Sequence, residues 1–415
     1  MTASIPGSVL IVGAGLAGFQ LAATLRRSGY DGEIEILGAE PHRPYDRPPL
    51  SKEFLTGTMS AHDLGLDDPG APLQARWSLG APAAALDPAT LTVRTSTGAT
   101  HRAEAVVLAT GCTPRIPAGM GPAGADSVGG GAAGLPEGAF VLGCLDDAVA
   151  LRQARVAGAR VAVLGGGFIA LEAAATAVAR QAAEVTLVAP ESLPLAGRIG
   201  AEAAHALREL HLRHGVRFAP PARVHGLSAD AGGRLRAVRL QHADGARAEL
   251  RADIAICGLG AAPTTGWLAG TGLAFDGAGR ILCDAAGRTS LPGVWAAGDC
   301  ANWEPSGPVP VPRPAGGHWQ DAVDHATVIG AALLGSGPPA LPPPYFWSEQ
   351  HGVRLQAAGH LIGHPRLSAG GIETADLLLV YELDGQETGI LGMDRPREVT
   401  RWRRGRARRP AVVAA

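Results

Sequence analysis

Two glycine-rich patterns carry the clearest chemistry in this 415-residue sequence. They are Gly13-x-Gly15-x-x-Gly18 and Gly165-x-Gly167-x-x-Ala170. The glycines of such a pattern allow a tight turn and let backbone approach a pyrophosphate closely. The pyrophosphate then lies at a helix N-terminus, where free N–H groups and the helix dipole favour negative charge. Two copies about 150 residues apart indicate that one chain holds two dinucleotides.

Each pattern has the flanking elements that this chemistry requires. Residues 9–12 form an apolar, β-rich run, and residues 16–27 space their apolar side chains by three or four positions. Residues 161–164 and the alanine-rich residues 168–180 repeat that arrangement. The sequence therefore predicts two strand-turn-helix units. The alternative is chance, because 58 of the residues are glycine, but two correctly flanked matches weigh against it.

Composition is typical of a multi-domain α/β enzyme. The length predicts two or three domains, and a hydrophobic content of 46% is ample for large cores. No apolar run is long enough to cross a membrane, and the first expected strand begins too early for a signal peptide. We therefore expect a cytoplasmic protein with no membrane partner. A net charge of −2 gives no indication of nucleic acid binding.

The five cysteines are scattered and form no C-x-x-C pair. This spacing predicts neither a metal site nor a redox-active disulfide. Any electrons must therefore be carried by a bound cofactor.

Several further blocks resemble one family along nearly the whole chain, in the same order. They are the two glycine patterns, residues 45–52 (YDRPPLSK), residues 297–299 (AGD) and residues 346–350 (FWSEQ). The chain resembles the FAD-dependent ferredoxin reductases, relatives of the glutathione-reductase-like flavoproteins. The resemblance implies an α/β fold with two Rossmann-like dinucleotide-binding domains, for FAD and NAD(P), and a small α+β C-terminal interface domain.

The expected domains follow from the same resemblance. Residues 1–115 and 251–334 would form a discontinuous FAD-binding domain, residues 116–250 an inserted NAD(P)H-binding domain, and residues 335–415 the C-terminal domain. Within this scheme the Gly/Ala/Pro-rich residues 119–138 are expected to be a linker or flexible loop.

The resemblance also implies site residues. Lys52 would lie beside the flavin and pair with Glu172, so that a cation stabilises the reduced flavin while a carboxylate orients the lysine. The alternative is an exposed lysine and a helix-surface glutamate. Asp299 would bind a ribityl hydroxyl of FAD or cap a helix, and Trp319 would lie near the flavin ring or pack in the core. The implied FAD contacts are Gly13, Gly15, Ala17, Gly18, Glu40, Arg47, Lys52, Ala83, Thr110, Gly111, Asp299 and Trp319. The implied NAD(P) contacts are Gly165, Gly167, Phe168, Ile169 and Glu191.

Some positions depart from the family pattern. Ala189 stands where an acid usually accepts hydrogen bonds from the NADH ribose, which leaves Glu191 as a substitute or a surface turn residue. The choice between NADH and NADPH therefore stays open. Gly143 replaces an arginine that contributes to holding FAD, and Gly317 replaces a glutamate near Trp319.

The last distinctive feature is the run of six arginines among residues 401–409. It would be a basic patch that attracts an acidic ferredoxin, or a disordered tail.

We expect an enzyme that passes electrons from NADH or NADPH through FAD to a ferredoxin-type iron-sulfur protein serving an oxygenase or P450 chain. The alternatives are a flavoenzyme with a weakened nicotinamide site that acts directly on a small molecule, and a pseudo-enzyme that only binds a partner. Monomer and homodimer are both open.

Overall fold

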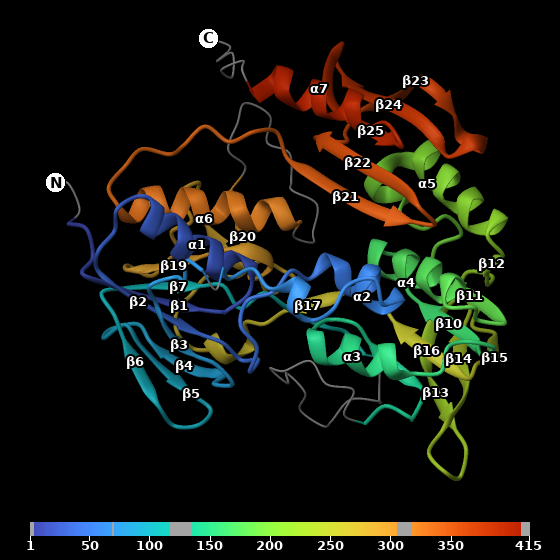
Figure 1. Ribbon diagram of the computed structural model, residues 1–415, viewed down its shortest axis with the longest axis horizontal. Coiled ribbons are helices and arrows are strands. Elements are labelled where there is room, and N and C mark those ends of the chain that lie inside the picture. The colour runs from blue at the N-terminus through green and yellow to red at the C-terminus, as the bar shows by residue number, and fades with distance from the viewer. Residues whose placement is uncertain (1–3, 69, 117–133, 305–317, 408–415) are drawn as a thin grey trace.

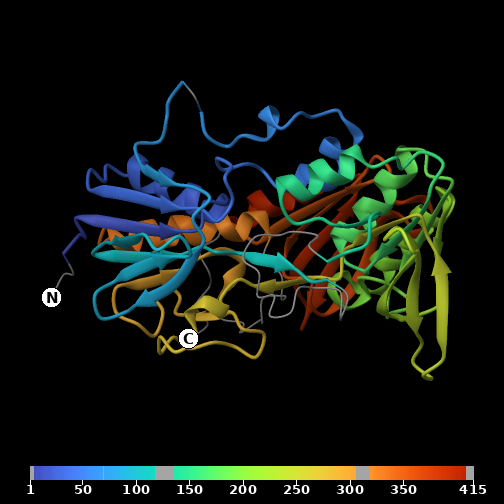
Figure 2. The ribbon, with the colours of Figure 1, turned by 90° about the horizontal axis from the view of Figure 1, so that it is seen from below.

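The computed structural model describes residues 4–68, 70–116, 134–304 and 318–407. Two parallel sheets lie toward opposite ends of the long axis, and a third, antiparallel sheet lies beside the second (Figure 1). The view from below keeps the first two sheets apart, at the left and right of the molecule (Figure 2). The expected linker at residues 119–138 falls mostly outside the described residues.

The first sheet is parallel throughout, in the order β19-β7-β1-β2-β3. Its strands are β1 (Ser8–Val12), β2 (Glu33–Leu37), β3 (Arg76–Ser78), β7 (Ala105–Leu108) and β19 (Val294–Ala296). The central strands are continuous apolar runs because both faces of the sheet are covered. Helices α1 (Leu16–Arg27) and α6 (Trp319–Leu333) pack on each other and on one face of this sheet. A small antiparallel sheet lies on the other side (Figure 1), and its strands are β4 (Ala83–Asp87), β5 (Thr92–Thr95) and β6 (Thr100–Arg102).

The second sheet repeats this plan in the order β12-β11-β10-β16-β9. Its strands are β9 (Ala139–Val141), β10 (Arg160–Leu164), β11 (Glu184–Val188), β12 (Val216–Phe218) and β16 (Ile254–Cys257). Its helices are α3 (Leu145–Gln153), α4 (Phe168–Ala179) and α5 (Ala196–Arg213), and an antiparallel sheet is appended from β13 (Arg223–Ala229), β14 (Leu235–Gln241) and β15 (Arg247–Arg251). Because β16 pairs with β10, the chain leaves this sheet only after Cys257, later than the expected boundary at residue 250.

The third sheet is antiparallel throughout. Its strands are β21 (Tyr345–Gln350), β22 (Val353–Gly359), β23 (His364–Gly371), β24 (Asp376–Leu383) and β25 (Gln386–Met393). Helix α7 (Pro396–Ala407) packs against it and contains four of the arginines of the basic run. The disordered-tail alternative is therefore wrong for residues 401–407, which belong to α7, and Arg408 and Arg409 lie outside the described residues.

Short elements connect these layers. They are η1 (Pro48–Ser51), α2 (Glu53–Thr56), η2 (His62–Leu64), η3 (Gly266–Leu268), η4 (Gly298–Cys300) and η5 (Ile372–Thr374), with the strand pairs β8 (Cys112–Pro114) with β17 (Ala261–Pro263) and β18 (Ile281–Cys283) with β20 (Ala301–Trp303). The predicted fold class is confirmed: two strand-turn-helix units open on the glycine patterns, and an α+β part follows.

One apolar core joins the second and third sheets. Buried side chains of α4 and α5 belong to the same cluster as Leu355, Leu377 and Leu391 of the third sheet. This shared core fixes β21 against α4, which determines the geometry of the site described below. Within the described ranges, no helix is both long and apolar enough to cross a membrane.

Candidate functional site

The first glycine loop follows β1 and leaves its backbone open for a ligand. Gly13 has φ +127°, and a Cβ there would lie 2.0 Å from the carbonyl oxygen of Ala109, so only glycine fits. A Cβ on Gly18 would lie 2.0 Å from the carbonyl oxygen of Gly13, which explains the third glycine of the pattern. By contrast, a Cβ on Gly15 would meet nothing within 4 Å. That open space at the N-terminus of α1 fits a pyrophosphate.

Other expected residues gather at the same edge of the first sheet. Thr110 and Gly111 follow β7, and Thr110 donates its hydroxyl to the carbonyl of Thr264 at 2.8 Å. Asp299 lies shortly after the end of β19. The preceding residue, Gly298 (φ +71°), packs against Ala17 at the start of α1, which places Asp299 beside the first glycine loop. The carboxyl ends of β1, β7 and β19 thus meet, as expected for a ligand site of a parallel sheet.

Asp299 is a half-buried carboxylate inside the short helix η4, so the alternative of a helix cap is wrong. Burial raises its pKa, the neighbouring Asp321 raises it further, and Arg47 lowers it. No hydrogen bond to its carboxylate is found within the described part of the chain. An acceptor in this state fits a hydroxyl-bearing ligand such as the ribityl chain of FAD.

Glu40 and Arg47 form an ion pair beyond the carboxyl end of β2, at 2.5 Å. Tyr45 donates its hydroxyl to the other oxygen of Glu40 at 2.6 Å and accepts the N–H of Leu145 at 2.9 Å. Arg47 also donates to the carbonyl of Gly143, at the position where the family pattern has an arginine. A Cβ on Gly143 would lie 2.1 Å from Cγ of Pro114, so the structure leaves no room there for a side chain.

Ala83 begins β4 and is largely buried. The preceding turn is held to the end of β2 by the N–H of Ala81, which donates to the carbonyl of Gly38 at 2.8 Å. The segment just before Ala83 therefore lies beside Gly38 and Glu40, at the carboxyl end of β2.

Lys52 and Glu172 form a buried ion pair between η1 and α4, with 3.0 Å between Nζ and Oε2. Their side chains are 12% and 7% exposed, so the alternative of two surface residues is wrong. Two prolines start η1 and fix its φ angles. Lys52 follows η1 directly and contacts Glu172 of α4. Figure 1 shows α2, which follows Lys52 directly, beside α4.

Lys52 is the single lysine of the sequence. Its ammonium donates to the carbonyl of Pro48 at 2.7 Å and to Glu172. An ammonium has three hydrogens, so the described residues leave one for a ligand.

Trp319 starts α6 and donates its indole N–H to Asp46 at 2.7 Å. Burial raises the pKa of Asp46, while Trp319 and Lys52 lower it. Trp319 also meets Trp347 of β21 edge to face, with ring centroids 6.0 Å apart. It therefore lies where the first sheet's helices meet β21 and does more than fill a core. Gly317 lies outside the described residues.

The second glycine loop has the same geometry as the first. Gly165 has φ +124°, and a Cβ there would lie 2.0 Å from the carbonyl oxygen of Gly258. A Cβ on Gly167 would meet nothing within 4 Å. The alanine at position 170 is accommodated because its methyl group faces Gly258, which has no side chain.

The edge beyond β11 holds the candidate ribose acceptor. Ala189 is buried and faces Gly166, as a Cβ on that glycine would lie 3.2 Å from its methyl group. Oε2 of Glu191 lies 3.5 Å from the same point. The carboxylate of Glu191 thus reaches back over the second glycine loop despite the intervening proline.

Phe168 and Ile169 begin α4 at the mouth of this loop. Ile169 is 51% exposed, so its side chain is accessible to a ligand at this loop. The Phe168 ring packs on Phe346 of β21, which stacks on His318.

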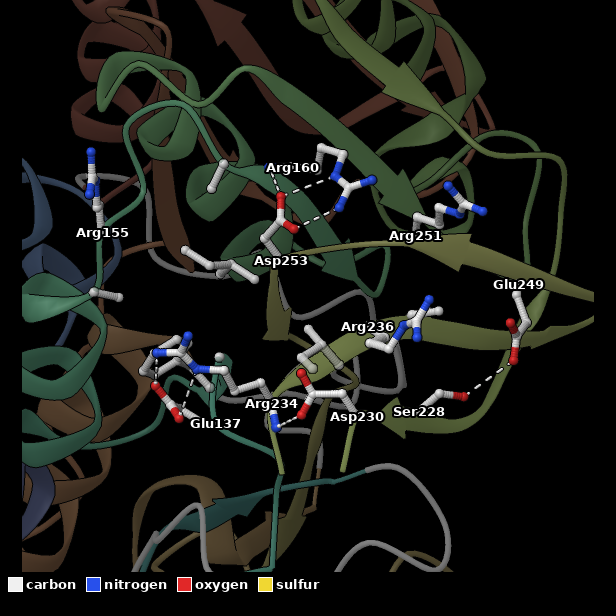
Figure 3. Close-up of a pocket in the computed structure, with 17 residues that line it drawn as sticks. Glu137, Arg155, Arg160, Ser228, Asp230, Arg234, Arg236, Glu249, Arg251 and Asp253 are labelled. Atoms are coloured by element: carbon white, nitrogen blue, oxygen red, sulfur yellow. Dashed lines mark hydrogen bonds and ion pairs between the residues drawn. The ribbon is translucent and has the colours of Figure 1, made fainter. Parts of the chain in front are cut away.

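A polar cavity of about 810 Å³ lies elsewhere on the second sheet (Figure 3). Arg160 and Ile254 line it, and they begin β10 and β16, whereas the glycine loop follows the end of β10. Arginines and acids pair across its wall, as Arg160 does with Asp253 at 2.7 Å. The cavity is therefore at the opposite edge of the sheet from the loop, and we assign no part of the dinucleotide site to it.

Sequence reasoning assigned no role to several side chains that complete the site. Ser51 and Ser348 both donate to Glu172, Asp46 holds Trp319, and Tyr45 holds Glu40. The sequence does hold an indication for Ser348. It lies two positions before Gln350 in a segment that begins with aromatic residues, so in a strand both polar side chains share one face.

Comparisons with known proteins agree with this geometry. Residues 7–326 match the model of the pyridine nucleotide-disulphide oxidoreductases, and residues 345–415 match that of the reductase C-terminal domain. Within the described residues no group of metal-binding side chains was found.

Curated relatives cover most of the chain. A ferredoxin–NAD(P)⁺ reductase of Sphingomonas is 33% identical over 91% of this chain and 87% of its own length. The putidaredoxin reductase of Pseudomonas putida is 32% identical over 93% of this chain and 88% of its own length. The structure of a covalent complex of putidaredoxin reductase with putidaredoxin superposes with a TM-score of 0.86 at 29% identity, over 98% of this chain and 94% of that one. With two glycine loops in the expected geometry and a family match across most of its length, the chain belongs to the pyridine nucleotide-disulphide oxidoreductase family, with the reductase C-terminal domain.

Proposed function

We propose that this protein is a flavoprotein reductase that passes electrons from NADH or NADPH, through FAD, to a ferredoxin-type iron-sulfur protein. The observation that carries the proposal is the buried ion pair of Lys52 and Glu172. Lys52 comes from the segment after the first glycine loop, and Glu172 lies in the first turns of the helix that the second loop opens. A charged pair in this position connects the two dinucleotide sites, where electrons must cross.

The described residues fit FAD in the first site. The Gly13–Gly18 loop would hold the pyrophosphate, Asp299 a ribityl hydroxyl, and Glu40 the adenosine ribose. Arg47 would supply the positive charge that Gly143 lacks, because its guanidinium already reaches that backbone. When bound, FAD supplies the redox chemistry by accepting a pair of electrons from a reduced nicotinamide and releasing them singly.

Lys52 would stabilise the negative charge that develops when electrons arrive. A positively charged donor that is already oriented costs no rearrangement during the reaction. Glu172 would hold that ammonium in place, and Trp319 would flank it through Asp46. These roles make Lys52 and Glu172 the residues whose replacement should affect electron transfer most.

The second site would hold the nicotinamide dinucleotide. The Gly165–Ala170 loop would bind its pyrophosphate, with Phe168 and Ile169 beside it at the start of α4. Glu191 would accept hydrogen bonds from the adenosine ribose, since its carboxylate reaches the loop. A carboxylate there disfavours a 2′-phosphate, which supports NADH as the preferred donor.

The proposed acceptor rests on the relatives and on charge. The relatives named above are ferredoxin and putidaredoxin reductases. Helix α7 presents Arg401 and Arg404 to solvent, and a basic surface favours encounter with an acidic protein.

We extend the proposal to the domain plan and location. Residues 1–115 and 258–334 would form the FAD domain, residues 116–257, which include β16, the nicotinamide domain, and residues 335–415 the C-terminal domain. All five cysteines are free thiols, which supports a reducing compartment such as the cytoplasm.

The test is an anaerobic stopped-flow experiment on the FAD-loaded protein. NADH should bleach the flavin absorbance rapidly and NADPH more slowly, and the reduced protein should then reduce an added [2Fe–2S] ferredoxin. A flavin that neither nucleotide reduces would contradict the proposal and favour a flavoenzyme that acts on another small molecule.

A further inference from the structure

Glu172 is the end of a buried chain of hydrogen bonds that leads away from Lys52. Its Oε1 accepts the hydroxyl of Ser348 at 2.6 Å, and Ser348 accepts the amide of Gln350 at 2.9 Å. Oε1 of Gln350 lies 2.8 Å from Nε2 of His211, and Nδ1 of His211 lies 3.0 Å from Nε2 of His351. The chain therefore runs from the ion pair, through β21, to α5.

The charge of Glu172 fixes the direction of every bond in this chain. A carboxylate only accepts, so Ser348 donates to it and must accept from Gln350. The carbonyl oxygen of Gln350 is then left to accept Nε2–H of His211. With that proton on Nε2, Nδ1 of neutral His211 accepts from His351. Each side chain thus has one arrangement that satisfies its neighbours.

The members from Glu172 to His211 are buried, His351 is partly buried, and together they come from different layers. Ser348 and His211 are fully buried, and Gln350 is 2% exposed. Ser348 and Gln350 project from the same face of β21 because they are two residues apart on a strand. Buried polar groups are costly unless they are satisfied, so a fully paired chain locks its members in one orientation.

We propose that Ser348, Gln350 and His211 are positioning residues that hold the carboxylate of Glu172 against Lys52. Without the Ser348 hydroxyl, Glu172 keeps only its bonds to Ser51 and Lys52, both on Oε2, and its carboxylate can rotate. The C-terminal sheet would thereby tune the ion pair between the two dinucleotide sites. This inference rests on the function proposed above for that pair.

The single lysine of the sequence allows a direct test without any nicotinamide. Protein made with ¹³Cε-labelled lysine has one labelled side chain, so its NMR signal reports the surroundings of Lys52. In the oxidised, FAD-loaded protein, Ser348→Ala should shift this signal. In the Glu172→Gln background, adding Ser348→Ala should leave it where it is, because Ser348 acts through the carboxylate.

Reduction kinetics give the second readout. Ser348→Ala should lower the rate constant of flavin reduction at saturating NADH about tenfold, as expected for a lost hydrogen bond to a charged group. Gln350→Met, one link further away, should have a smaller effect in the same direction. Both effects should disappear in the Glu172→Gln background, while the Kd for NADH stays unchanged.

Thr388→Val is the matched control. It removes a hydroxyl from the same sheet that donates only to backbone carbonyls, of Ile362 and Tyr381. It should change neither the NMR signal nor the rate constant. A rate constant that falls equally for Thr388→Val and Ser348→Ala would mean general damage to the sheet and would overturn the proposal.

Two further outcomes would overturn it. One is a wild-type lysine signal in Ser348→Ala and Gln350→Met, and the other is an equal effect of Ser348→Ala with and without Glu172. Wild-type protein that NADH and NADPH fail to reduce would instead refute the proposed function, and the NMR cycle would still decide whether Ser348 positions Glu172.

Discussion

The methyl group of Ala170 occupies the space that a side chain at Gly258 would need. A Cβ on Gly258 would lie 3.0 Å from that methyl group and 3.3 Å from the Cα of Ala170. The second dinucleotide loop therefore tolerates an alanine in place of its third glycine because the facing strand end carries a glycine. In the first loop, Gly18 has no such freedom, because a Cβ would meet the carbonyl oxygen of Gly13.

This pairing predicts the result of a double-mutant cycle. Gly258→Ala should lower the free energy of unfolding by about 1–3 kcal/mol through overpacking. Gly258→Ala should cost much less in a protein that already carries Ala170→Gly, since contacting residues couple. Urea denaturation of the four proteins measures the coupling.

Gly277→Ala is the control for that cycle, because a Cβ at this exposed glycine would meet nothing within 4 Å. It should leave stability nearly unchanged. Additive effects of the two changes at positions 170 and 258 would show that the residues do not share space.

Lys52 should be irreplaceable even by arginine. Lys52→Met should slow flavin reduction by NADH by about 100- to 1000-fold, the range seen when one preorganised donor is lost, while FAD stays bound. Lys52→Arg should recover little, because a planar guanidinium does not fit between Pro48 and the buried Glu172 as a compact ammonium does. Stopped-flow absorbance measures the rate constant.

An arginine elsewhere provides the comparison. Arg401→Met on the exposed face of α7 should leave flavin reduction by NADH at the wild-type rate. Equal rate constants for Lys52→Met and the wild type would remove Lys52 from the reaction.

Glu191 should carry the preference for NADH. Glu191→Gln should raise the Kd for NADH about tenfold, as expected when a charged acceptor is lost, and should leave the Kd for NADPH unchanged or lower. Ala189→Glu, made in the Glu191→Gln protein, should restore NADH affinity if its longer side chain reaches the same ribose. Titration of the protein with each nucleotide gives these constants, and an unchanged Kd in Glu191→Gln would show that the carboxylate does not touch the ribose.

Much of this site could be predicted from the sequence because its backbone chemistry is local. The turn at Gly13, the strand before it and the helix after it are specified within about 20 residues, and the order of the blocks resembles a known family. The Lys52–Glu172 contact could be anticipated only from that resemblance, because 120 residues separate the two in sequence.

What could not be predicted depends on side chains that meet across layers. The hydrogen bond of Ser348 to Glu172 joins residues 176 apart and requires the packing of β21 on α4. Likewise, the sequence shows only that Gly143 replaces an arginine of the family pattern, whereas the structure shows that Pro114 fills the space and that Arg47 contacts the same backbone. Such compensation is a property of three-dimensional neighbours, which spacing along the chain does not reveal.

Acid should destabilise the protein through His211. Burial lowers the pKa of this histidine to about 4, from an ordinary value of 6.5, and burial and the neighbouring His211 and His214 lower that of His351 to about 3. Between about pH 4 and pH 6.5 the unfolded chain therefore binds a proton at His211 that the folded chain does not bind. Stability from this source is complete above pH 6.5 and is lost as the pH falls toward 4, by about 3 kcal/mol for His211. Urea denaturation from pH 7 to pH 4.5 should show a steeper loss for the wild type than for His211→Gln, which cannot be protonated. Parallel losses in the two proteins would show that His211 titrates normally in the folded chain.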